Sequence, residues 1–367
     1  MDNIEFSIEK KGGYGFSAPS MIGVSPDYAP LWKSTLTYAA DACCVHNGYL
    51  WRNTSGAAST GVEPGTNYNV WNVTYANENL LDNPWFTVNQ RGVESIANKG
   101  YFVDRWFSSN TNAAHSITDN VITLGNTGAG NSFLRQFFGK PLTPGRTYTL
   151  SFVIKGTAKG YISVNRSDTN IIGGTAAING TFSNWTVVTK TLTIPNDELD
   201  AALCSIRCDS TFSYQIKAAK LELGSVSTLA QDTTPNYQQE LAKCQRFYQR
   251  YETFGGYYSI ITYGLSWSST TARLVFDLPV AMRPSAPSAT ETLPRLTVSD
   301  VSTLYIRDSA GTTNATVVSM ETGKLFINDT SKIRINATVD GGLTAAAPCF
   351  LRNSANVVLE FSSEPMG

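Results

Sequence analysis

The chain has 367 residues, a formal net charge of −1 and a charged fraction of 16%. This length predicts two or three domains, and the near-zero charge excludes a general electrostatic affinity for nucleic acid or for an anionic membrane. The N-terminal sequence contains acidic residues and no continuous apolar segment, so we expect no ordinary secretory signal. No stretch approaches the roughly 18–20 apolar residues of a membrane span, so we expect no membrane insertion.

Residues 1–29 contain the run GGYGFSAPS and little periodicity. This pattern predicts an extended arm whose order depends on what it docks against. Two interpretations stay open here, an attachment device and a frayed terminus.

Residues 30–76 carry short strand patterns rich in aromatic residues, which predict a small β-domain. Asn47-Gly48 lies between two apolar runs and predicts a two-residue hairpin, because both turn positions need positive φ. The block resembles the small chitin- and cellulose-binding modules of bacterial glycosidases and phage tail proteins. The positions that carry this resemblance are Trp32, Tyr38, Asn47-Gly48, Trp51, Pro64-Gly65 and Trp71.

The resemblance stops at residues 53–56, Asn-Thr-Ser-Gly, where sugar-binding members of that group carry an exposed aromatic pair. We therefore expect a structural or spacer role for this block rather than a working sugar site. Tyr68 and Tyr75 are the alternative stacking residues.

Residues 77–232 alternate apolar and polar side chains between Gly, Pro and Asn turns, which predicts an antiparallel jelly-roll sandwich. Cys204 and Cys208 share a strand face with Ile206 and are expected in the core. Three segments resemble a recurring frame in jelly-roll domains of phage tail and fibre proteins. They are Leu80–Gly92, Asp104-Arg105-Trp106 and Lys220–Gly224.

Arg105 and Trp106 are candidate ligand-binding residues, because an arginine beside a tryptophan can stack on a sugar and donate hydrogen bonds to it. The alternative is structural: Arg105 bridges a loop while Trp106 fills the core.

Residues 233–252 carry the helical periodicity of the chain and predict a linking helix. A helix this short is marginal alone, so its apolar stripe should pack on the chain's own β-domains or on copies of itself. We expect an oligomer interface, with a homotrimer as the favoured assembly, and the alternative is a helix that caps a sandwich. The stripe consists of Tyr237, Leu241, Cys244, Tyr248 and Tyr251.

Residues 253–367 return to strand patterns and predict a C-terminal β-sandwich domain. Together with the helix, the phrase LPVAMRPSAPSAT resembles the C-terminal domain of many phage tail fibres and receptor-binding proteins. An aromatic-dense run supplies candidate ligand contacts, since aromatic side chains combine contact area with polar edges. These candidates are Tyr257, Tyr258, Tyr263 and Trp267, and a subunit interface or a core strand is the alternative role.

The sequence supplies little material for catalysis. Its two histidines lie far apart, and no nucleophile elbow, phosphate loop or zinc motif is present. We expect no catalytic residues, no metal site and no cofactor, although a glycan depolymerase with paired carboxylates stays an alternative.

The resemblances together imply an all-β structural protein of a tailed bacteriophage: a tail fibre or receptor-binding protein located in the virion and assembled in the host cytoplasm. Its expected partners are other virion proteins, through the arm, and a host-surface glycan or protein receptor. A capsid decoration or head-fibre protein is the second alternative.

Overall fold

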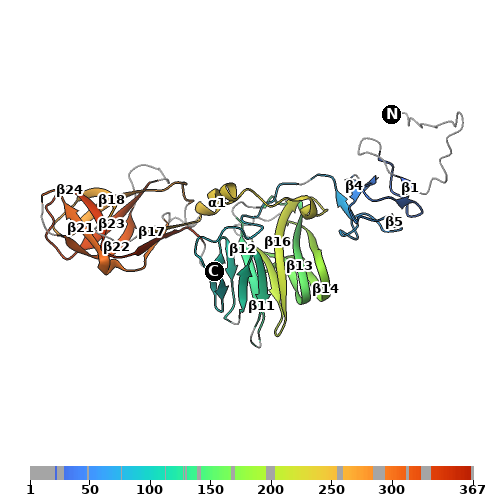
Figure 1. The fold of residues 1–367 in the computed structure, drawn as a ribbon, viewed down its shortest axis with the longest axis horizontal. Helices are drawn as coiled ribbons and strands as arrows, with labels where there is room; N and C mark the ends of the chain where they lie inside the picture. Colours follow the sequence, from blue (N-terminus) through green and yellow to red (C-terminus); the bar gives the residue numbers. More distant parts are fainter. Residues whose placement is uncertain are drawn as a thin grey trace. The chain divides into compact units, whose positions relative to one another are not determined.

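The computed structural model describes residues 21–22, 29–47, 49–75, 77–111, 113–126, 128, 130–138, 142–166, 170–195, 203–253, 259–283, 294–310, 314–323 and 332–364. The chain forms two compact units, one of Met1–Ala76 with Ala230–Asp232 and one of Asn77–Leu229 with Thr233–Gly367. The predicted fold class is confirmed: strands dominate both units, and α1 (Tyr237–Gln245) is the one α-helix of the described residues (Figure 1).

The first unit contains two small sheets. One has the order β1-β2-β5 and the other β3-β4-β6. Nearly all of the predicted arm lies outside the described residues, except that β1 pairs in parallel with β2. The strands are β1 (Met21–Ile22), β2 (Thr37–Tyr38), β3 (Cys43–His46), β4 (Tyr49–Asn53), β5 (Ser59–Thr60) and β6 (Trp71–Val73).

The predicted hairpin forms between β3 and β4, where His46 pairs with Tyr49 and Asn47 has a φ of 49°. Trp51 and Trp71 are buried, as expected for so small a core, and both indole N–H groups donate to backbone carbonyls. Trp32, also expected in this core, lies half-buried beside His46.

The second unit begins with a ten-stranded sheet that folds on itself. The order of its path is β7-β10-β11-β16-β13-β15-β12-β9-β8, and β14 pairs with β13. Figure 1 labels four neighbouring strands of this sheet, β11, β16, β13 and β14. Its strands are β7 (Ser95–Ile96), β8 (Gly100–Val103), β9 (Trp106–Ser108), β10 (His115–Thr118), β11 (Val121–Gly125), β12 (Ser132–Phe137), β13 (Thr147–Asn165), β14 (Ile171–Thr193), β15 (Leu203–Cys208) and β16 (Ser213–Leu223).

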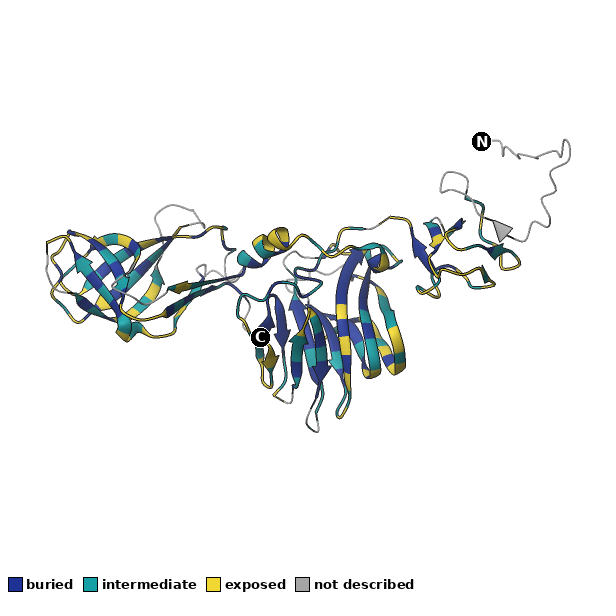
Figure 2. Cartoon of the chain, viewed as in Figure 1, coloured by how far each residue is buried: buried dark blue, intermediate teal, exposed yellow. Residues whose placement is uncertain are grey.

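The long β13–β14 hairpin connects the two layers of this sandwich. Residues 148–155 of β13 pair with β16, whereas residues 160–165 pair with β15. Side chains from both layers, such as Ile216 and Ile206, join one buried core. Figure 2 shows the buried residues along the strands in dark blue. Cys204 and Cys208 belong to this core, as the alternation predicts. Gly160 lets β13 and β15 approach each other closely, because a Cβ at this position would lie 1.9 Å from the carbonyl oxygen of Arg207.

Helix α1 is shorter than the predicted segment 233–252. It begins after Asn236, whose side chain accepts hydrogen bonds from the N–H groups of Gln238 and Gln239. The chain leaves the helix after Gln245 and continues as β17 (Tyr248–Thr253), which pairs with β25 (Val357–Ser362). The helical prediction is therefore wrong for Tyr248 and Tyr251, because pairing with a distant strand overrides the local periodicity.

The C-terminal block, predicted as a sandwich, forms a six-stranded closed barrel of order β18-β19-β23-β22-β21-β24. A separate three-stranded sheet, β17-β25-β20, adjoins the same hydrophobic core. The remaining strands are β18 (Ser259–Ser266), β19 (Thr271–Asp277), β20 (Arg295–Val298), β21 (Leu304–Asp308), β22 (Ala315–Gly323), β23 (Lys332–Val339) and β24 (Pro348–Asn353). The short 3₁₀ turns are η2 (Leu229–Gln231) and η3 (Val301–Thr303).

His115 on β10 makes the sandwich sensitive to acid. Its side chain is buried, and burial lowers its pKa to about 4. The folded state therefore binds fewer protons than the unfolded state between pH 4 and 6.5. The contribution of the buried, neutral His115 side chain to stability is full above pH 6.5 and decreases as the pH falls through this window. In denaturant titrations, we expect the stability advantage of the wild type over His115→Leu to shrink by about 3 kcal/mol from pH 7 to pH 4.

This comparison must use the difference between the two proteins, because Asp104 acts in the opposite direction. Burial raises the pKa of Asp104 to about 6, so its protonation favours the folded state as the pH falls. If the difference in stability between the wild type and His115→Leu did not change with pH, His115 would not be the cause of the acid sensitivity.

Candidate functional site

Arg105 and Trp106, the predicted ligand-binding pair, lie in the interior with almost no exposed surface. The indole N–H of Trp106 donates to the Asn83 carbonyl at 3.0 Å, and its ring packs on Phe86 and Phe152. Arg105 donates to Asp82 at 3.1 Å. This burial favours the structural role of the pair, because a glycan has no access to either side chain.

Two of the three segments that carry the jelly-roll resemblance, Leu80–Gly92 and Asp104-Arg105-Trp106, meet at a buried joint between the sandwich and the C-terminal block. We define the joint as Arg91, Asp104, Arg105, Tyr248 and Glu364. Arg91 pairs with Asp104 at 3.0 Å and with Glu364, and its guanidinium lies 3.6 Å from the centre of the Tyr248 ring. The N–H of Arg105 donates to Glu364 at 3.3 Å.

The charges of the joint compensate one another. Burial lowers the pKa of Arg91, but the carboxylates of Glu364 and Asp104 outweigh this effect and raise it above its ordinary value. Helix α1 is attached nearby, where the N–H of Asn83 donates to the buried carboxylate of Glu240 at 2.8 Å. The joint thus fixes the C-terminal block to the sandwich, and the hydrogen bond between Asn83 and Glu240 fixes the helix to it.

The predicted oligomer stripe does not form one exposed surface. Cys244 and Tyr248 are buried within the chain, and Tyr251 packs on Phe276 and Phe361. Leu241 is half-buried, and Tyr237 is 49% exposed. The stripe therefore gives little support to an axial interface, and the homotrimer stays a prediction.

Two predicted ligand contacts, Tyr263 and Trp267, lie on the outer surface of the barrel, where they are 65% and 61% exposed. Tyr257 and Tyr258 lie outside the described residues. Tyr263 and Trp267 form a continuous surface with three neighbours, Leu265, Arg273 and Val275. We call these five residues the barrel face.

The register of β18 and β19 explains the barrel face. Tyr263 pairs with Val275 and Leu265 pairs with Arg273, so all four side chains point outward. The Arg273 guanidinium lies 3.4 Å from the centre of the Trp267 ring. Leu265, Arg273 and Val275 are not predicted from the sequence, although the alternation in TYGLSW could have indicated Leu265.

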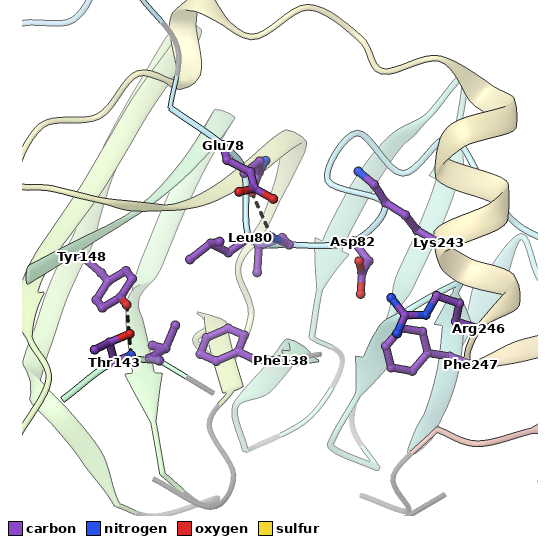
Figure 3. A pocket seen from close by; sticks show the side chains of 12 residues that line it. Glu78, Leu80, Asp82, Phe138, Thr143, Tyr148, Lys243, Arg246 and Phe247 are labelled. Carbon is purple, nitrogen blue, oxygen red and sulfur yellow. Dashed lines mark hydrogen bonds between the residues drawn. The ribbon is translucent and has the colours of Figure 1, made fainter. Parts of the chain in front are cut away.

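A pocket of about 330 Å³ lies between the sandwich and α1 (Figure 3). Phe138, Thr143 and Tyr148 lie on one side, while Lys243, Arg246 and Phe247 lie on the other. Two of the charged side chains that line the pocket already form ion pairs, Lys243 with Glu240 at 2.6 Å and Asp82 with Arg105 at 3.1 Å. The barrel face, whose aromatic side chains point to solvent, is therefore the stronger candidate for recognition.

Other kinds of site find little support in the described part of the chain. All six cysteines are buried and free, and burial raises the pKa of Cys44, Cys204 and Cys208 to about 12. Within the described residues, no group of three or more His, Cys, Asp or Glu side chains could hold a metal ion. None of the helices described is long and apolar enough to span a membrane.

No protein-family model matches the sequence, and neither does any curated protein. Among solved structures, the chain is similar to a CBM4 module, with 17% identity and a TM-score of 0.31 over 39% of this chain and 99% of that one. It is similar to the enzymatically active domain of bacteriophage CBA120 tailspike protein 4, with 16% identity and a TM-score of 0.30 over 40% of this chain and 21% of that one.

A third similar structure contains the CBM22-1 and GH10 modules of Clostridium thermocellum xylanase 10B in complex with xylohexaose. The identity is 16% and the TM-score 0.27, over 39% of this chain and 30% of that one. The chain thus spans under a third of the tailspike and xylanase chains. At these TM-scores the similarities carry no argument about function, which is inferred from the side chains.

Proposed function

We propose that the protein is a receptor-binding protein of a tailed bacteriophage that recognises a glycan on the host surface through the barrel face. The observation that carries this proposal is the exposed group of Tyr263, Trp267 and Arg273. Tryptophan, tyrosine and arginine are the residues most enriched at the energetic centres of protein interfaces, and flat aromatic rings also stack on sugar C–H groups.

The rest of the chain supports a binding role rather than catalysis. The joint attaches the C-terminal block, which contains the barrel, to the sandwich, and both belong to the second unit. The sequence resemblance to phage tail and fibre domains supplies the biological setting. In this proposal the N-terminal arm contacts other virion proteins, and repeated copies on one particle convert weak single contacts into avidity.

The barrel face is tested with Tyr263→Ala/Trp267→Ala. On arrays of bacterial capsular and outer-membrane polysaccharides, we expect the wild type to bind selected glycans and the double variant to bind them at least tenfold more weakly. Loss of two exposed aromatic anchors removes about 2–4 kcal/mol of binding free energy. Melting curves should be almost unchanged, since both side chains are largely exposed.

Tyr237→Ala is the matched control, because Tyr237 is also an exposed aromatic residue but lies on α1. We expect its binding to equal that of the wild type. The proposed role would be refuted if Tyr263→Ala/Trp267→Ala bound the glycans as tightly as the wild type, or if the wild type bound no polysaccharide. Antibody labelling of phage particles then separates the alternatives, since label on the tail supports a tail fibre and label on the head supports a decoration protein.

A further inference from the structure

A second aromatic group lies on the outer surface of the sandwich, away from the residues of the barrel face. It consists of Trp85, Lys155, Trp185 and Lys217, which come from four separate segments of the second unit. The Lys217 ammonium lies 5.8 Å from the centre of the Trp85 ring and 6.0 Å from that of Trp185. The Lys155 ammonium lies 5.9 Å from the centre of the Trp185 ring. We call this group the tryptophan–lysine site.

Two β-bulges shape this site. Between β13 and β16, Val153 pairs with Ala218 and Ile154 with Ile216, so Lys217 is an extra residue. Between β13 and β14, Ile154 pairs with Thr186 and Gly156 with Phe182, so residues 183–185 lie opposite Lys155 alone. Both neighbours of β13 are therefore bulged close to Lys155, β16 opposite Val153 and Ile154 and β14 opposite Lys155 itself. Bulges reorient side chains and are common beside functional sites.

Trp85 is presented by a strained but firmly held loop. Asn83 and Phe86 have φ values of 49° and 56°, a left-handed conformation that is costly for a side chain as large as Phe86. The buried Asn83 side chain donates to the carbonyls of Val88 and Asp104, and the N–H of Ala219 donates to the carbonyl of Pro84. Such strain persists only where the surroundings enforce it, and it is concentrated at functional sites.

The surroundings of the site favour an anionic ligand. The outward neighbours of Lys155 in the pairing register are Gln215 and, one strand further, Thr123. Val153, Val187 and Ala218 form the next row on this face, where Ala218 is buried and the two valines are half-buried, so these register positions carry no negative charge. Both tryptophans are half-buried, which leaves part of each ring accessible on a rigid support.

We propose that the tryptophan–lysine site binds an acidic polysaccharide. Each indole offers a flat face to the C–H groups of a sugar ring, while Lys217 and Lys155 pair with the carboxylates of uronic or sialic acid residues. Single-stranded nucleic acid also combines flat rings with negative charge. It is the weaker candidate, because such binding needs a cationic groove along the backbone and the net charge of this chain is −1.

The test uses affinity electrophoresis of the full chain in gels that contain polygalacturonate, alginate, hyaluronate or polysialate, with neutral dextran and galactan in parallel. We expect at least one acidic polymer to retard the wild type, with at least tenfold higher affinity than either neutral polymer. Lys155→Gln/Lys217→Gln should remove most of this preference, Trp185→Ala should abolish retardation, and added salt should weaken it.

Lys159→Gln is the matched control, because the Lys159 ammonium also lies over an aromatic ring, 5.7 Å from the centre of Phe212, but outside the site. We expect retardation equal to that of the wild type. The proposal is overturned if no acidic polymer retards the chain, if a lysine variant that melts like the wild type is retarded equally, or if an oligo-dT strand binds more tightly than every acidic polymer.

This proposal stands or falls separately from the proposed function. Tyr263→Ala/Trp267→Ala should keep the retardation by acidic polymers, because neither residue belongs to the tryptophan–lysine site. Conversely, Lys155→Gln/Lys217→Gln should keep the binding that depends on the barrel face.

Discussion

Replacement of Arg91 by methionine is expected to destabilise the second unit by about 3–5 kcal/mol, because it leaves two buried carboxylates without their cation. The Asp104 side chain is 1% exposed and the Glu364 side chain 0% exposed, and Arg91 pairs with both. The variant also loses the contact of Arg91 with the Tyr248 ring. Calorimetry should report a lower melting temperature, and limited proteolysis should cut near the joint.

A compensated variant tests whether charge is the cause. In Arg91→Met/Asp104→Asn/Glu364→Gln, no unpaired carboxylate stays at these positions, so most of the lost stability should return. Arg52→Ala is the control for loss of an ion pair at the surface, since the side chains of Arg52 and Asp41 are 52% and 70% exposed. It should cost less than about 1 kcal/mol. If Arg91→Met lowered the free energy of unfolding no more than Arg52→Ala does, the ion pairs of the joint would not be what couples the C-terminal block to the sandwich.

The features that the sequence predicts well are those with short-range causes. Asn47 marks the hairpin because a two-residue turn needs positive φ, and the structure places β3 and β4 on either side of it. The alternation around Ile206 predicts that Cys204 and Cys208 face the core, because side chains in a strand alternate between its two faces.

The features that the sequence does not predict depend on residues far apart in the chain. Arg91 and Glu364 are separated by 273 positions, so nothing local indicates that Arg91 and Arg105 belong to a joint. The end of α1 is missed because Tyr248 pairs with Ser362 of β25.

The tryptophan–lysine site is missed for a related reason. Lys217 reaches its position through a bulge, and a period-two pattern does not reveal where a strand gains a residue. Tyr263 and Trp267 could be selected from the sequence as aromatic candidates, but their exposure depends on how the barrel closes. The composition of a candidate site is thus easier to predict than the surface on which it lies.

Gly264 is expected to be indispensable for the barrel face. It lies between Tyr263 and Leu265 and pairs with Leu274, and an added Cβ would lie 2.0 Å from the carbonyl oxygen of Arg273 and 2.7 Å from the Cα of Leu274. Both are backbone atoms of β19, which cannot retreat without breaking the β18–β19 pairing. We expect Gly264→Ala to lower the free energy of unfolding by more than about 4 kcal/mol, and polysaccharide binding through the barrel face to fall with it.

Gly100→Ala is the control for this substitution, because the nearest atom to its added Cβ is the Ile96 Cδ1, the end of a flexible side chain, at 3.3 Å. That side chain can rotate away, so a change of less than about 1 kcal/mol is expected. Denaturant titration and the polysaccharide array together check the result. A Gly264→Ala protein with wild-type stability would mean that β18 and β19 do not pair in this register, and the outward placement of Tyr263 beside Val275 would lose its basis.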